Sequence, residues 1–128
     1  MKKILIIDDE KDCVLLLSEI LEYENFEVDT STSGLEALDK LKSNSYALII
    51  TDIMMPDIMM PDMDGIALIE IILAKYKSTR VIIMSGWFDQ SELQHLHDKN
   101  PQFIKAVLTK PFSPIFLKET IIQELDKV

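Results

Sequence analysis

Five polar residues of this 128-residue chain each stand at the end of a short apolar run, and together they could bind a cation and a phosphoryl group. They are Asp8, Asp9, Asp52, Ser85 and Lys110. Clustered carboxylates repel each other, so three of them in one place favour a bound divalent cation. Oxygen ligands prefer Mg²⁺ to zinc, and the sequence offers no competing group of cysteines and histidines. A hydroxyl and an ammonium beside a metal-bound carboxylate would form a receptor for a phosphoryl group.

The elements that must bring these residues together are parallel strands. Short apolar runs predict strands over Lys3–Ile7, Phe26–Thr30, Ala47–Thr51, Val81–Met84 and Ala106–Leu108. Amphipathic stretches predict helices over Lys11–Tyr23, Gly34–Lys42, Gly65–Tyr76, Ser91–Lys99 and from Ser113-Pro114 to about Lys127. Strands that alternate with helices indicate an α/β fold, a doubly wound parallel sheet of five strands with helices on both faces. Ligands of such sheets lie at the carboxyl ends of the strands.

Each of these polar residues also has an ordinary structural explanation. An aspartate after a strand is often a helix cap or a turn residue, and either Asp9 or Asp12 could cap the first helix. Chance is a poor explanation for suitable groups at four separate strand ends. The combination therefore favours a site.

Composition excludes several classes of function. The chain has 13 Lys+Arg against 22 Asp+Glu, a formal net charge of −9, which argues against direct binding to nucleic acid or to an anionic membrane. No apolar run is long enough for a membrane span or a signal peptide. The single cysteine, Cys13, cannot form an intrachain disulfide. We expect a cytoplasmic protein of one domain.

Five motifs follow one another along the chain. They are Ile4-Leu5-Ile6-Ile7-Asp8-Asp9-Glu10, Asp52-Ile53-Met54-Met55-Pro56, Met63-Asp64-Gly65, Ile82-Ile83-Met84-Ser85-Gly86 and Leu108-Thr109-Lys110-Pro111-Phe112. Together they resemble the receiver domain of two-component response regulators, and the resemblance covers nearly the whole chain. It implies a flavodoxin-like sheet of order 2-1-3-4-5, and it makes residues 1–128 a single receiver domain without an output domain.

The resemblance also implies a set of ligands for Mg²⁺. Asp9 would bind the ion directly, Asp8 would bind it largely through water, and Asp52 would be a third acidic residue of the metal site. The backbone carbonyl of Met54, two residues after Asp52, would be a further ligand.

By the same resemblance, Asp52 is the phosphoacceptor. It would take a phosphoryl group from a sensor histidine kinase or a phosphotransfer protein, while Ser85 and Lys110 contact the phosphoryl oxygens. Phosphorylation would then change a surface that binds a downstream protein. The resemblance thus implies a phosphorelay switch rather than a turnover enzyme.

One segment departs from the family pattern. Ile53–Asp57 is repeated at once as Ile58–Asp62, where the family has a single unit, so the loop after the third strand is five residues longer. Counting forward from the strand makes Asp52 the acceptor, and counting backward from the Asp-Gly pair at 64–65 makes Asp57 the acceptor.

Physical reasoning favours Asp52. If Asp57 stood at the strand end, Pro56 would lie inside a central strand, where proline removes a ladder hydrogen bond. A slip of five residues is odd, so it would also turn every side chain of the strand to the opposite face.

Two alternatives stay open. The longer loop could impair phosphorylation, which would make the chain a degenerate receiver that binds partners without being phosphorylated. A phosphatase of the haloacid dehalogenase type also uses a nucleophilic aspartate with Mg²⁺, but it requires an Asp-x-Asp pattern that neither Asp8-Asp9 nor Asp52-Ile53-Met54 provides.

Overall fold

The structure of the chain is a computed structural model, and it describes most of the residues. The described residues are 2–8, 10–52, 65–76, 79–85, 98, 103–109 and 113–126. The predicted helix Ser91–Lys99 therefore lies outside the described residues except for Asp98, which is helical.

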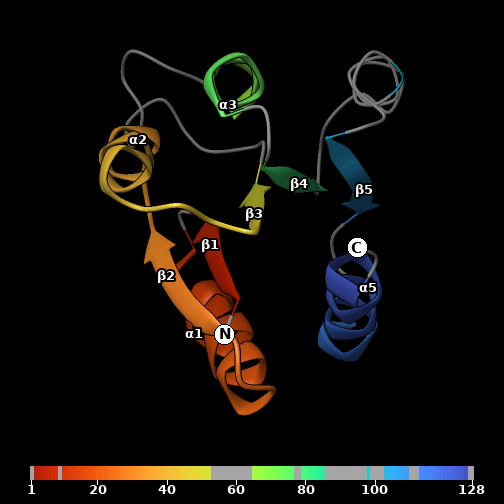
Figure 1. The fold of residues 1–128 in the computed structure, drawn as a ribbon. Helices are drawn as coiled ribbons and strands as arrows, with labels where there is room; N and C mark the ends of the chain where they lie inside the picture. Colours follow the sequence, from red (N-terminus) through yellow and green to blue (C-terminus); the bar gives the residue numbers. More distant parts are fainter. Residues whose placement is uncertain are drawn as a thin grey trace.

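Five parallel strands form one sheet (Figure 1). They follow the order β2-β1-β3-β4-β5, which confirms the expected doubly wound topology. Their bounds are β1 Lys3–Ile7, β2 Glu27–Ser31, β3 Leu48–Asp52, β4 Arg80–Ser85 and β5 Ile104–Thr109. Strand β5 is longer than predicted because its pairing with β4 begins at Ile104, opposite Val81.

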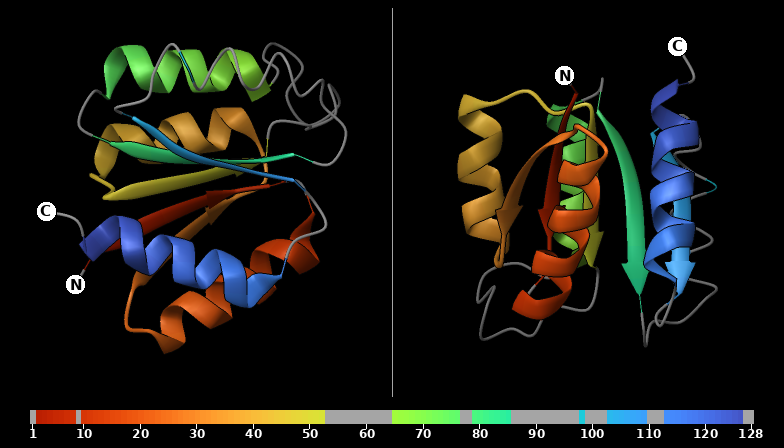
Figure 2. Two further views of the ribbon diagram at one scale, coloured as in Figure 1. Left: turned by 90° about the vertical axis from the view of Figure 1, so that its right-hand side faces the viewer. Right: turned by 90° about the horizontal axis from the view of Figure 1, so that it is seen from below.

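Helices cover both faces of the sheet (Figure 2). Helices α2 and α3 lie on one face, and α1 and α5 lie on the other. Their bounds are α1 Lys11–Tyr23, α2 Gly34–Ser43, α3 Gly65–Lys75 and α5 Pro114–Asp126. In the part of the chain with described structure, none of these helices has the length and apolarity that a membrane span needs.

The alternation of side chains along the strands explains the two cores. In β1, Leu5 and Ile7 pack with residues of α2 and α3, whereas Ile4 and Ile6 pack with residues of α1 and α5. All four side chains are fully buried. A strand that is covered on both faces needs this continuous apolar run, which is why the sequence of β1 is so easily recognised.

Two basic side chains near the start of the strands donate hydrogen bonds to the C-terminal carbonyl groups of α5. The Lys2 ammonium donates a hydrogen bond to the carbonyl oxygen of Leu125, and the Arg80 guanidinium donates one to that of Glu124. The last turn of α5 has no basic residue of its own, so these contacts supply donors for its terminal carbonyl groups. They also place the first and last described segments of the chain side by side, at the edge where the strands begin.

A polar network at the same edge joins β1, β2 and the segment before β3. The side chain of Tyr46 is largely buried, and its hydroxyl donates a hydrogen bond of 2.6 Å to Oδ2 of Asp29. Lys3 Nζ lies 3.5 Å from the same oxygen. The Lys3 ammonium also lies 5.5 Å from the centre of the Tyr46 ring. The hydrogen bond from Tyr46 and the charge of Lys3 lower the pKa of Asp29, although partial burial opposes the shift. Burial, together with the contact to Asp29, raises the pKa of Tyr46.

We predict that Tyr46→Phe lowers the free energy of unfolding by about 1–2 kcal/mol near neutral pH, because Asp29 loses a donor. Asp29 has a lowered pKa in the folded state, so its contribution is present above its unfolded pKa and is lost as the pH falls through the folded value. The difference between the two proteins should therefore shrink below about pH 4. Tyr46 has a raised pKa, so wild type should also lose stability above about pH 10, and the variant should not share that loss.

Urea unfolding at a series of pH values measures these effects. Tyr23→Phe is the matched control, because Tyr23 is 85% exposed. Equal destabilisation by the two substitutions would contradict the role given to the Tyr46–Asp29 hydrogen bond.

Candidate functional site

The carboxyl ends of β1 and β3 bring two of the predicted site residues to one edge of the sheet. Asp52 is the last residue of β3 and lies opposite Met84 of β4. Asp8 directly follows β1, and its backbone N–H donates a 3.0 Å hydrogen bond to the carbonyl of Ser31. Both side chains are buried, with 0% exposure for Asp8 and 3% for Asp52. Two buried carboxylates therefore lie at the carboxyl ends of neighbouring strands, and the hydrogen bonds of the sheet fix the backbone that carries them.

Glu10 completes an acidic cluster with these two residues. One carboxylate oxygen from each of Asp8, Glu10 and Asp52 lies within 4.8 Å of the others. The Glu10 side chain is exposed, in contrast to the other two. Its backbone N–H donates a 2.9 Å hydrogen bond to Oδ1 of Asp8. The cluster thus combines two buried aspartates with one exposed glutamate.

The donors of the acidic cluster suit a hard divalent cation. Carboxylate oxygens are preferred ligands of Mg²⁺ and Ca²⁺, and the cluster contains no nitrogen or sulfur ligand. Oxygens that share one octahedral Mg²⁺ are about 3 Å apart when adjacent and about 4.2 Å apart when opposite. The three oxygens of the cluster lie within 4.8 Å of one another, so modest side-chain movements would bring them onto one ion. A cation would also relieve the mutual repulsion of the carboxylates. The residues present therefore fit the metal that the sequence led us to expect.

Several predicted site residues cannot be compared with the structure. Ser85 is the last residue of β4, and its backbone pairs with Thr109, the last residue of β5. The structure does not describe the Ser85 side chain. Four others lie outside the described residues altogether: Asp9, Met54, Asp57 and Lys110. Their convergence on the acidic cluster stays a prediction.

Glu10 is the residue that sequence reasoning did not assign to the site. It occupies the N-cap position of α1, and its side chain makes no capping hydrogen bond there. The suggestion that Asp12 caps this helix is wrong, because Asp12 lies within the first turn. A third acid directly after Asp8 and Asp9 was the available signal, but an acidic residue at the start of a helix is common for electrostatic reasons alone.

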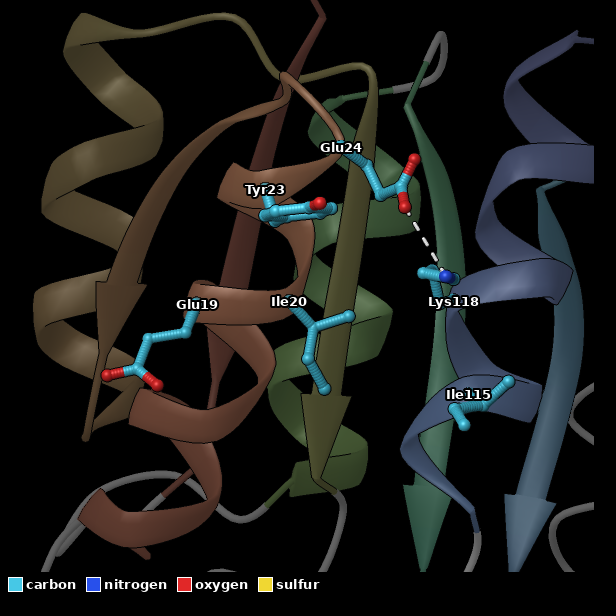
Figure 3. Close-up of a pocket in the computed structure, with 6 residues that line it drawn as sticks. All are labelled: Glu19, Ile20, Tyr23, Glu24, Ile115 and Lys118. Carbon is cyan, nitrogen blue, oxygen red and sulfur yellow. Dashed lines mark hydrogen bonds and ion pairs between the residues drawn. The ribbon is translucent and has the colours of Figure 1, made fainter.

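A second feature of the surface is an apolar hollow between α1 and α5, shown in Figure 3. Its volume is about 320 Å³. An ion pair of 3.3 Å between Glu24 and Lys118 links the two helices at its margin. Both Tyr23 and Ile115 are more than half exposed. The residues that line it are Glu19, Ile20, Tyr23, Glu24, Ile115 and Lys118. None of them belongs to the acidic cluster.

Comparisons with known proteins agree on one family. The family described as the response regulator receiver domain matches residues 4–122. A transcriptional regulatory protein, SrrA of Staphylococcus aureus, is 32% identical over 112 residues, which are 88% of this chain and 43% of that protein. The CpxR homolog of Haemophilus influenzae, also named a transcriptional regulatory protein, is 50% identical over 56 residues, 44% of this chain and 24% of its own length. The chain spans less than half the length of these curated relatives.

Solved structures of the same family match the fold of this chain. A CheY-like response regulator receiver domain protein from Methanospirillum hungatei matches with a TM-score of 0.86 and 28% identity, over 99% of this chain and 95% of that one. A two-component response regulator from Clostridium difficile matches with a TM-score of 0.85 and 25% identity, over 99% and 98% of the two chains.

Proposed function

Because this chain belongs to the receiver domains of two-component response regulators, we propose that Asp52 accepts a phosphoryl group from a histidine kinase in a reaction that requires Mg²⁺. The observation that carries the proposal is the position of Asp52. Its carboxylate is buried at the carboxyl end of β3, and it shares the acidic cluster with Asp8 and Glu10. A carboxylate in such a place can be both a metal ligand and a nucleophile.

The proposed reaction is an in-line transfer. A carboxylate oxygen of Asp52 forms a bond to phosphorus as the bond from phosphorus to the donor nitrogen breaks, and that nitrogen keeps the electron pair. The proton on the other ring nitrogen of the phosphohistidine stays in place, so the products are an acyl phosphate on Asp52 and a neutral histidine on the donor. Bound Mg²⁺ would neutralise charge on the phosphoryl oxygens. The Asp8 N–H donates to the Ser31 carbonyl, and Asp8 Oδ1 accepts from the N–H of Glu10, so these two hydrogen bonds hold the Asp8 carboxylate at the site before the donor arrives.

The remaining roles rest on the resemblance to the family. We infer that Asp9 and the Met54 carbonyl complete the metal site, and that Ser85 and Lys110 contact the phosphoryl group. Lys110 comes one residue after Thr109, which ends β5 beside the end of β4. That position supports an ammonium at the same edge of the sheet as Asp52.

We further propose that residues 1–128 act as one receiver domain in the cytoplasm, a phosphoacceptor rather than a turnover enzyme. The match over residues 4–122 supports a single domain, and one cysteine is compatible with a reducing compartment. The partners would be a sensor histidine kinase or a phosphotransfer protein, and a downstream protein that recognises the phosphorylated form.

Intact-mass measurement after treatment with acetyl phosphate tests the proposed function. We expect a mass increase of one phosphoryl group in the presence of Mg²⁺ and none when EDTA removes the metal. No increase under either condition would favour a degenerate receiver. Continuous release of phosphate from an added phosphate ester would instead indicate an enzyme.

A further inference from the structure

We propose that Glu10 supplies a carboxylate to the solvent side of the cation site formed by Asp8 and Asp52, and that it thereby raises the affinity of the chain for Mg²⁺. This inference rests on the proposed function, because it assigns one more residue to the same metal site. It is carried by the geometry of the acidic cluster, in which a Glu10 oxygen lies within 4.8 Å of oxygens from both aspartates.

The backbone of Glu10 is anchored, so its side chain starts from a fixed point. Its N–H donates to Oδ1 of Asp8 at 2.9 Å, and its carbonyl oxygen accepts a 3.1 Å hydrogen bond from the N–H of Val14. The first contact ties Glu10 directly to a residue of the cluster, and the second ties it to the first turn of α1. The backbone is thus already placed, so less ordering is needed when the Glu10 carboxylate approaches the cluster.

The side chain is directed toward the cluster rather than toward the helix. Glu10 occupies the N-cap position, where a side-chain oxygen often accepts a hydrogen bond from the first turn, but it makes no such bond. Its carboxylate is instead grouped with those of Asp8 and Asp52. This orientation brings like charges together, an arrangement that a bound cation would favour.

Burial gives Glu10 a role different from that of the aspartates. Asp8 and Asp52 are 0% and 3% exposed, whereas Glu10 is exposed. A cation that enters from solvent therefore meets the Glu10 carboxylate at the outer side of the site. An exposed ligand is screened more by water and salt than a buried one, so we expect a moderate effect on affinity.

Calorimetric titration with Mg²⁺ at fixed ionic strength tests the role of Glu10 without a phosphodonor. Glu10→Gln should weaken Mg²⁺ binding roughly three- to tenfold. The matched control is Glu22→Gln, which removes the same charge from an exposed position in the last turn of α1 and should change the affinity by less than about twofold. Glu10→Asp keeps the charge with a shorter reach, and its dissociation constant should lie between those of wild type and Glu10→Gln.

Two other results would be decisive. If Glu10→Gln and Glu22→Gln bind Mg²⁺ equally well, the inference about Glu10 is wrong. The Glu10 carboxylate would then contribute only to the electrostatics of the α1 N-terminus. If wild type itself binds no Mg²⁺, the metal dependence in the proposed function fails, whatever the variants do. Unfolding curves without metal check that the variants are folded, and Glu10→Asp remains informative if Glu10→Gln is unstable.

Discussion

Asp52→Asn should abolish phosphorylation by acetyl phosphate, whereas Asp57→Asn should leave the mass increase intact. Asparagine nearly preserves the size of the side chain but removes the anionic oxygen that would attack phosphorus. Asp52 ends β3 and shares the acidic cluster with Asp8, so the loss of its charge should also weaken Mg²⁺ binding. Intact-mass analysis of the two variants beside wild type provides the measurement.

The same pair of variants tests the register after the third strand. Asp57 is the acceptor if the loop is counted backward from the Asp-Gly pair, and each substitution serves as the control for the other. A mass increase that persists in Asp52→Asn and disappears in Asp57→Asn would reverse the assignment. Urea unfolding of both proteins would show whether a lost signal reflects chemistry or loss of folding.

Deletion of Ile58–Asp62 should tighten Mg²⁺ binding by roughly tenfold and speed phosphorylation by acetyl phosphate. The reason is the length of the loop, because the resemblance makes the carbonyl of Met54 a metal ligand and the family has only one copy of the repeated unit. An extra unit in the same loop would misplace that ligand. Calorimetric titration of wild type and the deletion variant gives the two affinities.

A control variant separates the length of the repeat from its chemistry. Replacing Met59 and Met60 by serine keeps the length and removes two adaptable apolar side chains. If length matters, this variant should bind Mg²⁺ as wild type does. An unchanged affinity in the deletion variant would reject the hypothesis that the repeat impairs the site, and the methionines would then be better regarded as an interaction surface.

The strands of this fold could be recognised from the sequence because they are covered on both faces. A run such as Ile4–Ile7 has no polar position, and it can be stable only inside a parallel sheet with helices on either side. The meeting of Asp8 with Asp52 followed from the rule that parallel strands end at one edge. The order of the strands came from the resemblance, since periodicity alone does not say which strands are neighbours.

Other features depend on contacts that no local pattern encodes. The start of β5 at Ile104 is set by its pairing with β4, across a register shift between Val81 and Ile82. The hydrogen bond from Tyr46 to Asp29 joins residues 17 positions apart, and the local sequence around either residue does not predict the contact. The role of Glu10 also depends on tertiary structure. A glutamate before a helix is explained by local electrostatics alone, and only the fold shows its carboxylate beside those of Asp8 and Asp52.

The contact between Lys2 and the last turn of α5 bears on how the chain could be rearranged. Since the first and last described segments meet at the edge where the strands begin, a short linker could join the two ends without crossing the sheet. Domains whose ends lie this close commonly tolerate circular permutation. The acidic cluster stands at the opposite edge, where the strands finish. A reporter protein fused at either end would therefore leave the approach of a phosphodonor open.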